Sequence, residues 1–201
     1  MIDVRTITDL QRTTVDQWHR TETNNPYDGF LHLVCEQHQR NYLLWHQEDI
    51  ARSPDVTDEG IASVKRKIDQ LNQQRNDLIE KIDIGLINQL EAWGARPRPG
   101  ARLNTETPGS VIDRLSILAL RIYHMEEQLA RDDADDEHRA MVRAKLEILH
   151  EQLRDLSGSL IELLDDIVAG RKRLKVYRQF KMYNDPSLNP YLYAVAQKPA
   201  A

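Results

Sequence analysis

The chain has 201 residues, of which 40% are hydrophobic and 29% charged, and a formal net charge of −5 at pH 7. This composition is typical of a globular domain and excludes collagen-like or disordered sequence. There is no apolar run of about 18 residues that would span a membrane, and the first residues lack the apolar segment of a signal peptide. The single cysteine, Cys35, excludes an internal disulfide and a cysteine-based zinc site. We therefore expect one cytoplasmic domain over residues 1–201, with its core over about 20–185.

Apolar residues recur at three- and four-residue spacing between the prolines, a pattern that predicts helices separated by proline-containing breaks. In chain order we expect helices over about 3–20, 28–51, 57–93, 109–131, 134–168 and 171–183. Thr107-Pro108 is a strong helix start signal, and Gly94 and Gly170 are typical helix ends. The predicted fold is an all-α antiparallel bundle of about six helices. Two of them are long, at about 50 Å each. We expect no sheet and at least about 70% helix.

The predicted helix over 28–51 carries polar side chains on its inward face. His38, Asn41 and Asp49 share an arc with Leu31 and Val34. Burying an unpaired imidazole or amide costs about 1–3 kcal/mol, so each of these groups requires a partner or a ligand. Two interpretations stay open here, a hydrogen-bonded core network and a binding pocket.

The predicted helix over 57–93 shows a similar anomaly. Arg75 lies between Leu71 and Leu78 in the middle of the apolar stripe. A guanidinium in that position must contact a carboxylate, for which Asp49 and Asp69 are candidates, or an anionic ligand. A second polar stripe runs along the edge of the same face and consists of Asp69, Asn72, Asn76 and Asp83.

We expect these two helices to pack antiparallel as neighbours because a short connection joins them. Residues 38–49 would then face residues 69–83. On the helix over 109–131, Arg114 and Arg121 lie seven residues apart on one edge. They either face the acidic stripe or flank the helix in solvent.

The stretch from Arg171 to Lys181, RKRLKVYRQFK, contains six basic residues and no acidic ones. Basic and aromatic residues together indicate either phosphate contact or a helix docked by its aromatic side chains. The acidity of the whole chain argues against a nucleic-acid partner, so residues 171–193 are interpreted as a basic and aromatic tail.

Four segments of the chain carry a family resemblance. They are HQRNYLLWHQED (38–49), KIDQLNQQRNDLIEKID (67–83), TPGSVIDRLSILALRIYHMEEQ (107–128) and VYRQFKMYNDPSLNP (176–190). Together they resemble an uncharacterised bacterial all-helical family known only as a domain of unknown function, over about residues 20–193. The resemblance implies a link to glycosyltransferase and surface-polysaccharide genes. It implies no catalytic residues.

Two hypotheses of function follow. In the first, a pocket inside the bundle binds an anionic small molecule, for which the resemblance suggests a phosphorylated sugar or a nucleotide sugar. His38 or Asp49 would act as a general base. The ligand-binding residues would be Asn41, Asp69, Asn72, Arg75, Asn76 and Asp83, with Arg114 or Arg121 assisting Arg75.

In the second hypothesis the bundle is a non-enzymatic scaffold that forms a homodimer or holds a partner such as a glycosyltransferase. Whether the protein is an enzyme stays open. A carboxylate-bridged metal site would need two Glu-x-x-His units, and the only one present is Glu147 to His150. We therefore predict no metal ion and no cofactor.

Overall fold

The computed structural model describes residues 3–180, 182 and 185–196. Its helices are α1 (Val4–Trp18), α2 (Gly29–Ala51), α3 (Asp58–Ala92), α4 (Pro108–Leu129), α5 (Asp136–Val168) and α6 (Pro190–Ala196). Helices make up 71% of the described residues, which confirms the predicted all-α class. Within this part of the chain, none of the helices has the length and apolarity needed to cross a membrane.

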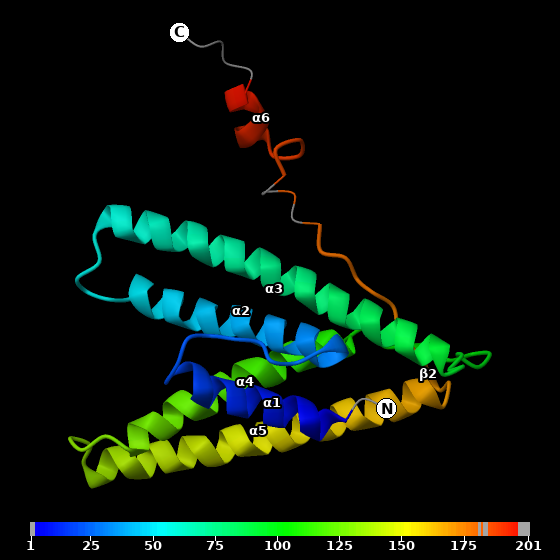
Figure 1. Cartoon of the computed structure of the whole chain (residues 1–201), viewed down its shortest axis with the longest axis horizontal. Helices are drawn as coiled ribbons and strands as arrows, with labels where there is room; N and C mark the ends of the chain where they lie inside the picture. The colour runs from blue at the N-terminus through cyan, green and yellow to red at the C-terminus, as the bar shows by residue number, and fades with distance from the viewer. Residues whose placement is uncertain (1–2, 181, 183–184, 197–201) are drawn as a thin grey trace.

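The bundle is built from two helical hairpins and one shorter helix (Figure 1). Helices α2 and α3 form the first antiparallel hairpin, and α4 and α5 form the second. Helix α1 packs against α4, α2 and α5, so it bridges the two hairpins. Helix α4 contacts α1, α2, α3 and α5 and is therefore the central helix.

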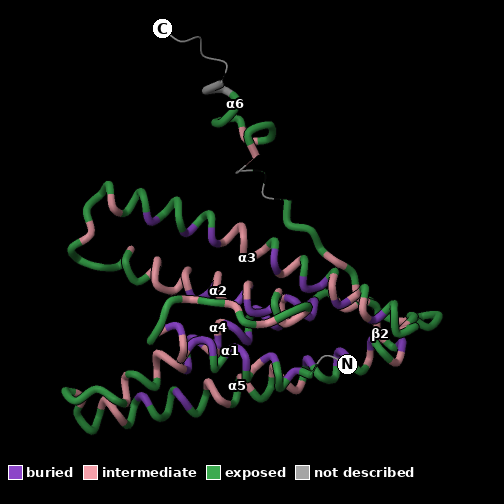
Figure 2. The backbone as a smooth tube through the Cα atoms, in the orientation of Figure 1, coloured by how far each residue is buried: buried purple, intermediate pink, exposed green. Residues whose placement is uncertain are grey.

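The buried residues concentrate around α1 and α4, in the centre of the bundle (Figure 2). Ile7, Ile82, Ile112, Leu115 and Leu160 are fully buried there and come from four helices. Helix α1 belongs to this core although it precedes residue 20, where the core was expected to begin. The apolar face of α4 is thus covered from several sides, which its largely apolar sequence requires.

Side-chain caps explain why the helix starts agree with the sequence signals. The Thr57 hydroxyl accepts a hydrogen bond from the Gly60 N–H, and the Thr107 hydroxyl accepts one from the Ser110 N–H. Asp135 caps α5 in the same way. Each cap satisfies an amide that has no partner inside its helix.

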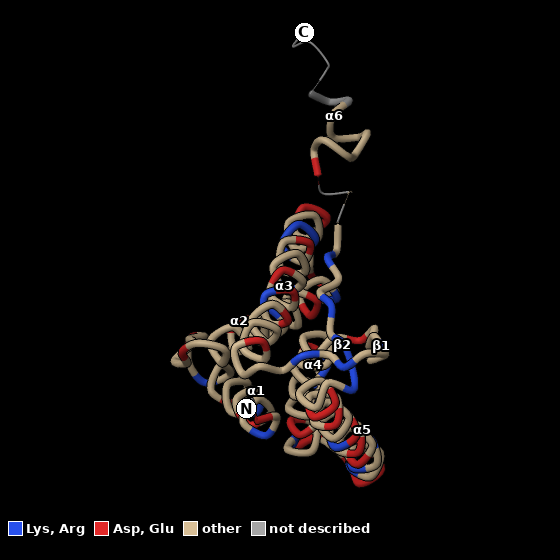
Figure 3. The backbone as a smooth tube through the Cα atoms, turned by 90° about the vertical axis from the view of Figure 1, so that its right-hand side faces the viewer, with Lys and Arg blue, Asp and Glu red and all other residues tan. Residues whose placement is uncertain are grey.

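The predicted sixth helix over 171–183 is wrong for residues 171–180, and its remaining part lies mostly outside the described residues. Gly170, with φ of +71°, ends α5, and the chain continues as the two-residue strand β2 (Lys172–Arg173). This strand pairs in parallel with β1 (Arg102–Leu103), a minor exception to the predicted absence of a sheet. The physical reason is that basic side chains three or four residues apart on a helix would repel one another, whereas the extended chain after α5 separates them (Figure 3). The short α6, which was not predicted, projects away from the bundle (Figure 1).

The two hairpins approach each other closely at the start of α4. A Cβ atom on Gly109 would be 2.7 Å from the Ile79 carbonyl oxygen and 2.9 Å from the Asp83 carboxyl group. The Gly109 N–H donates a 2.7 Å hydrogen bond to that carboxylate. Glycine is therefore required here by the contact between α3 and α4.

We expect Gly109→Ala to destabilise the protein by about 1–3 kcal/mol, because the backbone carbonyl of Ile79 cannot move aside without displacing α3. The matched control is Gly158→Ala, since a Cβ atom on Gly158 in α5 would have no neighbour within 4 Å. That change should stabilise the protein by about 0.5–1 kcal/mol. Urea denaturation of the two variants measures both effects, and a shift of the same sign in both would contradict the close-contact explanation.

Candidate functional site

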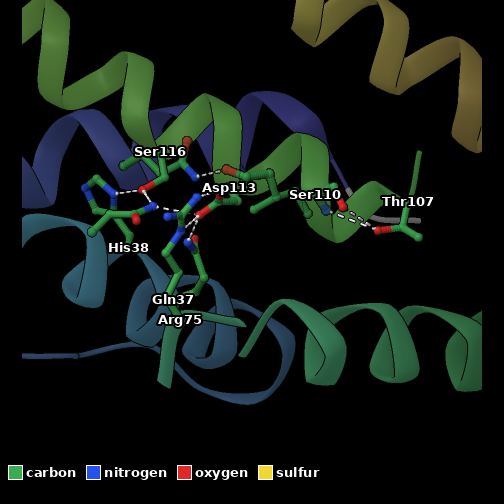
Figure 4. Close-up of polar contacts among 10 residues, drawn as sticks. Gln37, His38, Arg75, Thr107, Ser110, Asp113 and Ser116 are labelled. Carbon is green, nitrogen blue, oxygen red and sulfur yellow. Dashed lines mark hydrogen bonds and ion pairs between the residues drawn. The ribbon is translucent and has the colours of Figure 1, made fainter. Parts of the chain in front are cut away.

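A buried polar network lies where α2, α3 and α4 meet, and Asp113 of α4 is its centre (Figure 4). The Arg75 guanidinium donates two hydrogen bonds to this carboxylate, from Nε to Oδ1 at 2.7 Å and from Nη2 to Oδ2 at 2.5 Å. The side-chain amides of Gln37 and Asn41 donate to Oδ1 at 2.6 and 3.0 Å. One carboxylate from α4 thus holds side chains of both α2 and α3.

Ser116 forms the second part of the network, one helical turn after Asp113. Its hydroxyl oxygen accepts a hydrogen bond from Asn41 Nδ2 at 2.8 Å and lies 2.6 Å from Nδ1 of His38. His38 is fully buried, and its ring stacks on Trp18 of α1 with centroids 5.2 Å apart. Asn41 therefore bridges Asp113 and Ser116 and connects the two parts.

Burial and hydrogen bonding shift the ionisation of these groups in ways that suit a structural network. The bidentate hydrogen bonds to Asp113 raise the pKa of Arg75. Burial lowers the pKa of His38 to about 3, so its ring is neutral near pH 7. An imidazole with so low a pKa is a weak base, and because His38 is fully buried a solvent-borne substrate cannot reach it.

A second buried carboxylate, that of Asp83, lies at the amino end of α4. It accepts the Gly109 N–H, and burial raises its pKa above the usual value. A carboxylate in this position interacts favourably with the unpaired amides of a helix N-terminus. Asp83 therefore joins α3 to the start of α4, outside the Asp113 network.

Arg75 contacts a carboxylate, as predicted, but the partner is Asp113 and neither Asp49 nor Asp69. Asp49 is exposed on α2 and lies 3.9 Å from the His46 ring, and exposed Asp69 pairs with Lys65. The ion-pair alternatives proposed from the sequence are therefore wrong. The reason is that α4 lies across the α2–α3 hairpin and supplies the acid from a third helix.

The predicted face-to-face arrangement of α2 and α3 is reached only in part. The two helices pack side by side, but His38 and Asn41 turn toward α4 and bond to Ser116. Asn72 and Asn76 of α3 are partly buried and are not members of the network. Of the predicted site residues, the structure brings together His38, Asn41 and Arg75.

A series of pockets follows the outer side of α4. The first, of about 380 Å³, includes Asn41, Trp45, Asp49, Arg52 and Arg75 and shares Ile117 with the second. The second, of about 450 Å³, lies between α4 and α5. Its lining residues are Arg114, Ile117, Leu118, Arg121, Gln152, Asp155, Leu156 and Ser159. The predicted ligand residues Arg114 and Arg121 are thus one pocket away from Arg75.

A third pocket of about 360 Å³ continues from the second, with which it shares Arg114, Leu156 and Ser159, and reaches Lys172 on β2. We call the three pockets together the α4 groove. Shared lining residues make it one elongated surface feature.

The sequence analysis missed a cluster of three histidines, His19, His46 and His124. They come from the C-cap of α1 and from α2 and α4, and their ring centroids lie 5.0–5.8 Å apart. One ring nitrogen of each lies within 4.8 Å of the others. The spacing of His46 and Asp49 was the only local signal, since the other two residues are far away in the chain.

The fold and the network define an all-α bundle in which the central helix α4 carries buried polar residues that bind both helices of the neighbouring α2–α3 hairpin. The chain belongs to the family described as "Protein of unknown function (DUF4254)", whose model matches residues 31–176. Comparison with curated proteins found no match, and comparison with solved structures found none either.

Proposed function

We propose that this protein binds an elongated anionic small molecule, of the sugar-phosphate or nucleotide-sugar class, in the α4 groove. The observation that carries the proposal is the row of three adjoining pockets along α4, with an indole at one end and unpaired cationic charge in the middle. Each pocket falls in the range of about 300–1,000 Å³ that is usual for small-molecule sites.

The Trp45 end of the groove has the composition of a sugar or base subsite. Trp45 supplies an aromatic wall beside the apolar side chains of Leu44 and Leu120. The Asn41 and Asp49 side chains in the same pocket offer polar groups for hydroxyls. Aromatic surface combined with a few convergent polar groups suits a ligand with one apolar face.

The middle of the groove supplies the positive charge. Arg121 is exposed there and makes no ion pair within the described part of the chain. Arg114 lines the same pocket and pairs with Glu106 at 2.6 Å. A guanidinium presents a planar fork of donors that matches phosphate geometry, so Arg121 is our main anion-binding residue.

Arg75 has a different role in this proposal. Asp113 already neutralises its guanidinium, so Arg75 serves to hold the groove wall and is not the principal anion ligand. Asp155 and Ser159, in the same pocket as Arg121, offer partners for sugar hydroxyls. The proposed function is binding, and His38 has no catalytic part in it because it is fully buried.

The proposal keeps the link to glycosyltransferase and surface-polysaccharide genes that the family resemblance implied, for a bacterial protein acting in envelope polysaccharide metabolism. The cytoplasmic location expected from the composition is kept as well. An elongated groove is compatible with an activated sugar, whose nucleotide and sugar would occupy neighbouring pockets. This part rests on the resemblance and on the chemistry of the groove.

The test is isothermal titration calorimetry of the full chain at low salt with UDP-glucose and with glucose 1-phosphate as probes. We expect saturable binding that Trp45→Ala and Arg121→Ala each weaken by at least about tenfold. The matched controls are Trp93→Ala and Arg143→Ala, which remove exposed residues that do not line the groove. These controls should leave the affinity unchanged.

The second candidate function, a scaffold, is favoured by exposed apolar side chains near the C-terminus. Phe180 and Tyr191 are 82% and 85% exposed, an unusual state for aromatic residues. In the same experiment, absent binding of both probes together with a dimer in light scattering would replace the ligand-binding function with the scaffold.

A further inference from the structure

Three helices each contribute one histidine to a compact cluster beside the α4 groove. His19 stacks on Tyr123 with ring centroids 4.1 Å apart, and His124 stacks on Trp45 at 4.7 Å. His46 contacts both of the other histidine rings edge-on. The aromatic neighbours restrict the orientation of the imidazoles, so the cluster is a defined structural feature at the edge of the core.

The Nδ1 atom of each ring faces an oxygen on its own helix. His19 Nδ1 lies 2.8 Å from the Val15 carbonyl oxygen, and His124 Nδ1 lies 2.7 Å from the Glu127 carboxylate. His46 Nδ1 is 3.9 Å from the Asp49 carboxylate. At His19 and His124 the oxygen is within hydrogen-bond distance and favours a proton on Nδ1, which leaves the lone pair on Nε2.

The three Nε2 atoms are in the complementary situation. All three are buried, and none has a hydrogen-bond partner among the described residues. A buried nitrogen lone pair without a donor is unfavourable, and here three of them occur together. One ring nitrogen of each histidine lies within 4.8 Å of the others, so the three rings are close enough to share a single cation.

We propose that His19, His46 and His124 bind one divalent transition-metal ion through their Nε2 atoms, and that the ion is Zn²⁺. Three imidazoles bind zinc at about 2.0–2.1 Å and leave one tetrahedral position for water or a ligand atom. Ligand nitrogens in such a site are about 3.4 Å apart, as follows from those bond lengths and tetrahedral angles. The observed separations of up to 4.8 Å would shorten to that spacing on ion binding.

The arrangement also provides the outer partners that metal-bound histidines usually have. A carboxylate or carbonyl that accepts the Nδ1 proton fixes the ring and makes Nε2 a better ligand, and Glu127 and the Val15 carbonyl occupy these positions for His124 and His19. For His46, the Asp49 carboxylate lies 3.9 Å from Nδ1, beyond hydrogen-bond distance. The site does not depend on the proposed sugar ligand. It shares Trp45 and Asp49 with the α4 groove, which would place the metal beside a bound molecule.

The test uses the full chain, produced without a histidine tag, stripped with a chelator and titrated with Zn²⁺ in a calorimeter. We expect one equivalent to bind, and His46→Ala and His124→Ala each to weaken the affinity by at least about 100-fold. His150→Ala is the matched control, because His150 lies on α5 outside the cluster, and it should bind as the unmodified chain does. Co²⁺ should compete for the same site and show the visible absorption of four-coordinate cobalt.

A second variant protects the test against unfolding of the histidine variants. Glu127→Gln changes an exposed residue and keeps all three ligands, and it should weaken Zn²⁺ binding by about 10- to 100-fold. The proposal is overturned if the unmodified chain shows no saturable binding. Equal affinities in the His46→Ala and His150→Ala proteins would also overturn it.

Discussion

Asp113→Ala should cost about 3–5 kcal/mol of folding free energy, the largest effect that we expect of any single substitution in the Asp113 network. The change leaves the Arg75 guanidinium and the amides of Gln37 and Asn41 without their shared acceptor. The Arg75 side chain is 23% exposed, whereas that of Asp113 is 6% exposed. Partial access of Arg75 to water places the expected cost toward the lower end of the range.

Urea denaturation monitored by circular dichroism measures this cost, and the neighbouring Arg114 supplies the control. Arg114→Ala breaks an exposed pair with Glu106 and should change stability by no more than about 1 kcal/mol. A double variant, Arg75→Met with Asp113→Asn, removes the buried charges together and keeps an acceptor for the amides. It should recover part of the loss, with a coupling of about 0.5–3 kcal/mol. Equal costs for Asp113→Ala and Arg114→Ala would show that the network contributes no stability.

Stability should fall as the pH is lowered from about 6.5 toward 3, and His38 should account for a large share of the fall. Burial lowers the pKa of this ring from 6.5 to about 3 in the folded protein. Between these values the unfolded chain binds a proton at His38 that the folded chain does not, so the contribution is fully present above pH 6.5. It is then lost by about 1.4 kcal/mol for each unit that the pH falls through the window.

The measurement is the free energy of unfolding in urea at several pH values between 3.5 and 7, compared with the His38→Asn variant. Asparagine retains a polar atom near the position of Nδ1 but does not titrate, so the difference between the two slopes isolates His38. The comparison is needed because burial raises the pKa of Asp83, which acts in the opposite direction. His32→Asn, at an exposed position, should keep the original slope. If His38→Asn also keeps it, the ring is not held neutral by burial.

The sequence predicted the helix ends well where a capping residue, a proline or a glycine determines them. Thr107, Pro108 and Gly170 mark ends that the structure places within two residues of the expected bounds. The position of Arg75 between Leu71 and Leu78 was sufficient to predict a contact with a carboxylate or an anionic ligand, because an unpaired guanidinium is too costly in an apolar stripe.

The partner of Arg75 could not be predicted with the same certainty, because it depends on how the second hairpin docks. Asp113 sits between Ile112 and Leu115 in a helix that is apolar on most sides, and only the rotation of α4 shows that it points at Arg75. The histidine cluster could not be predicted for the same reason. His19 and His124 lie on helices that are far apart in sequence, and no local spacing connects them.

The orientation of the two hairpins depends on more than apolar packing. A leucine- and isoleucine-rich surface such as that of α4 would accept its neighbours after a slip of one helical turn, about 5.4 Å, with little change in the apolar area it covers. Such a slip would carry Asp113 and Ser116 away from Arg75, Asn41 and His38 and leave each of them unpaired. The buried polar groups therefore stabilise one alignment among several that would bury about the same apolar area. The shape of the α4 groove therefore depends on the hairpin alignment that the polar network fixes.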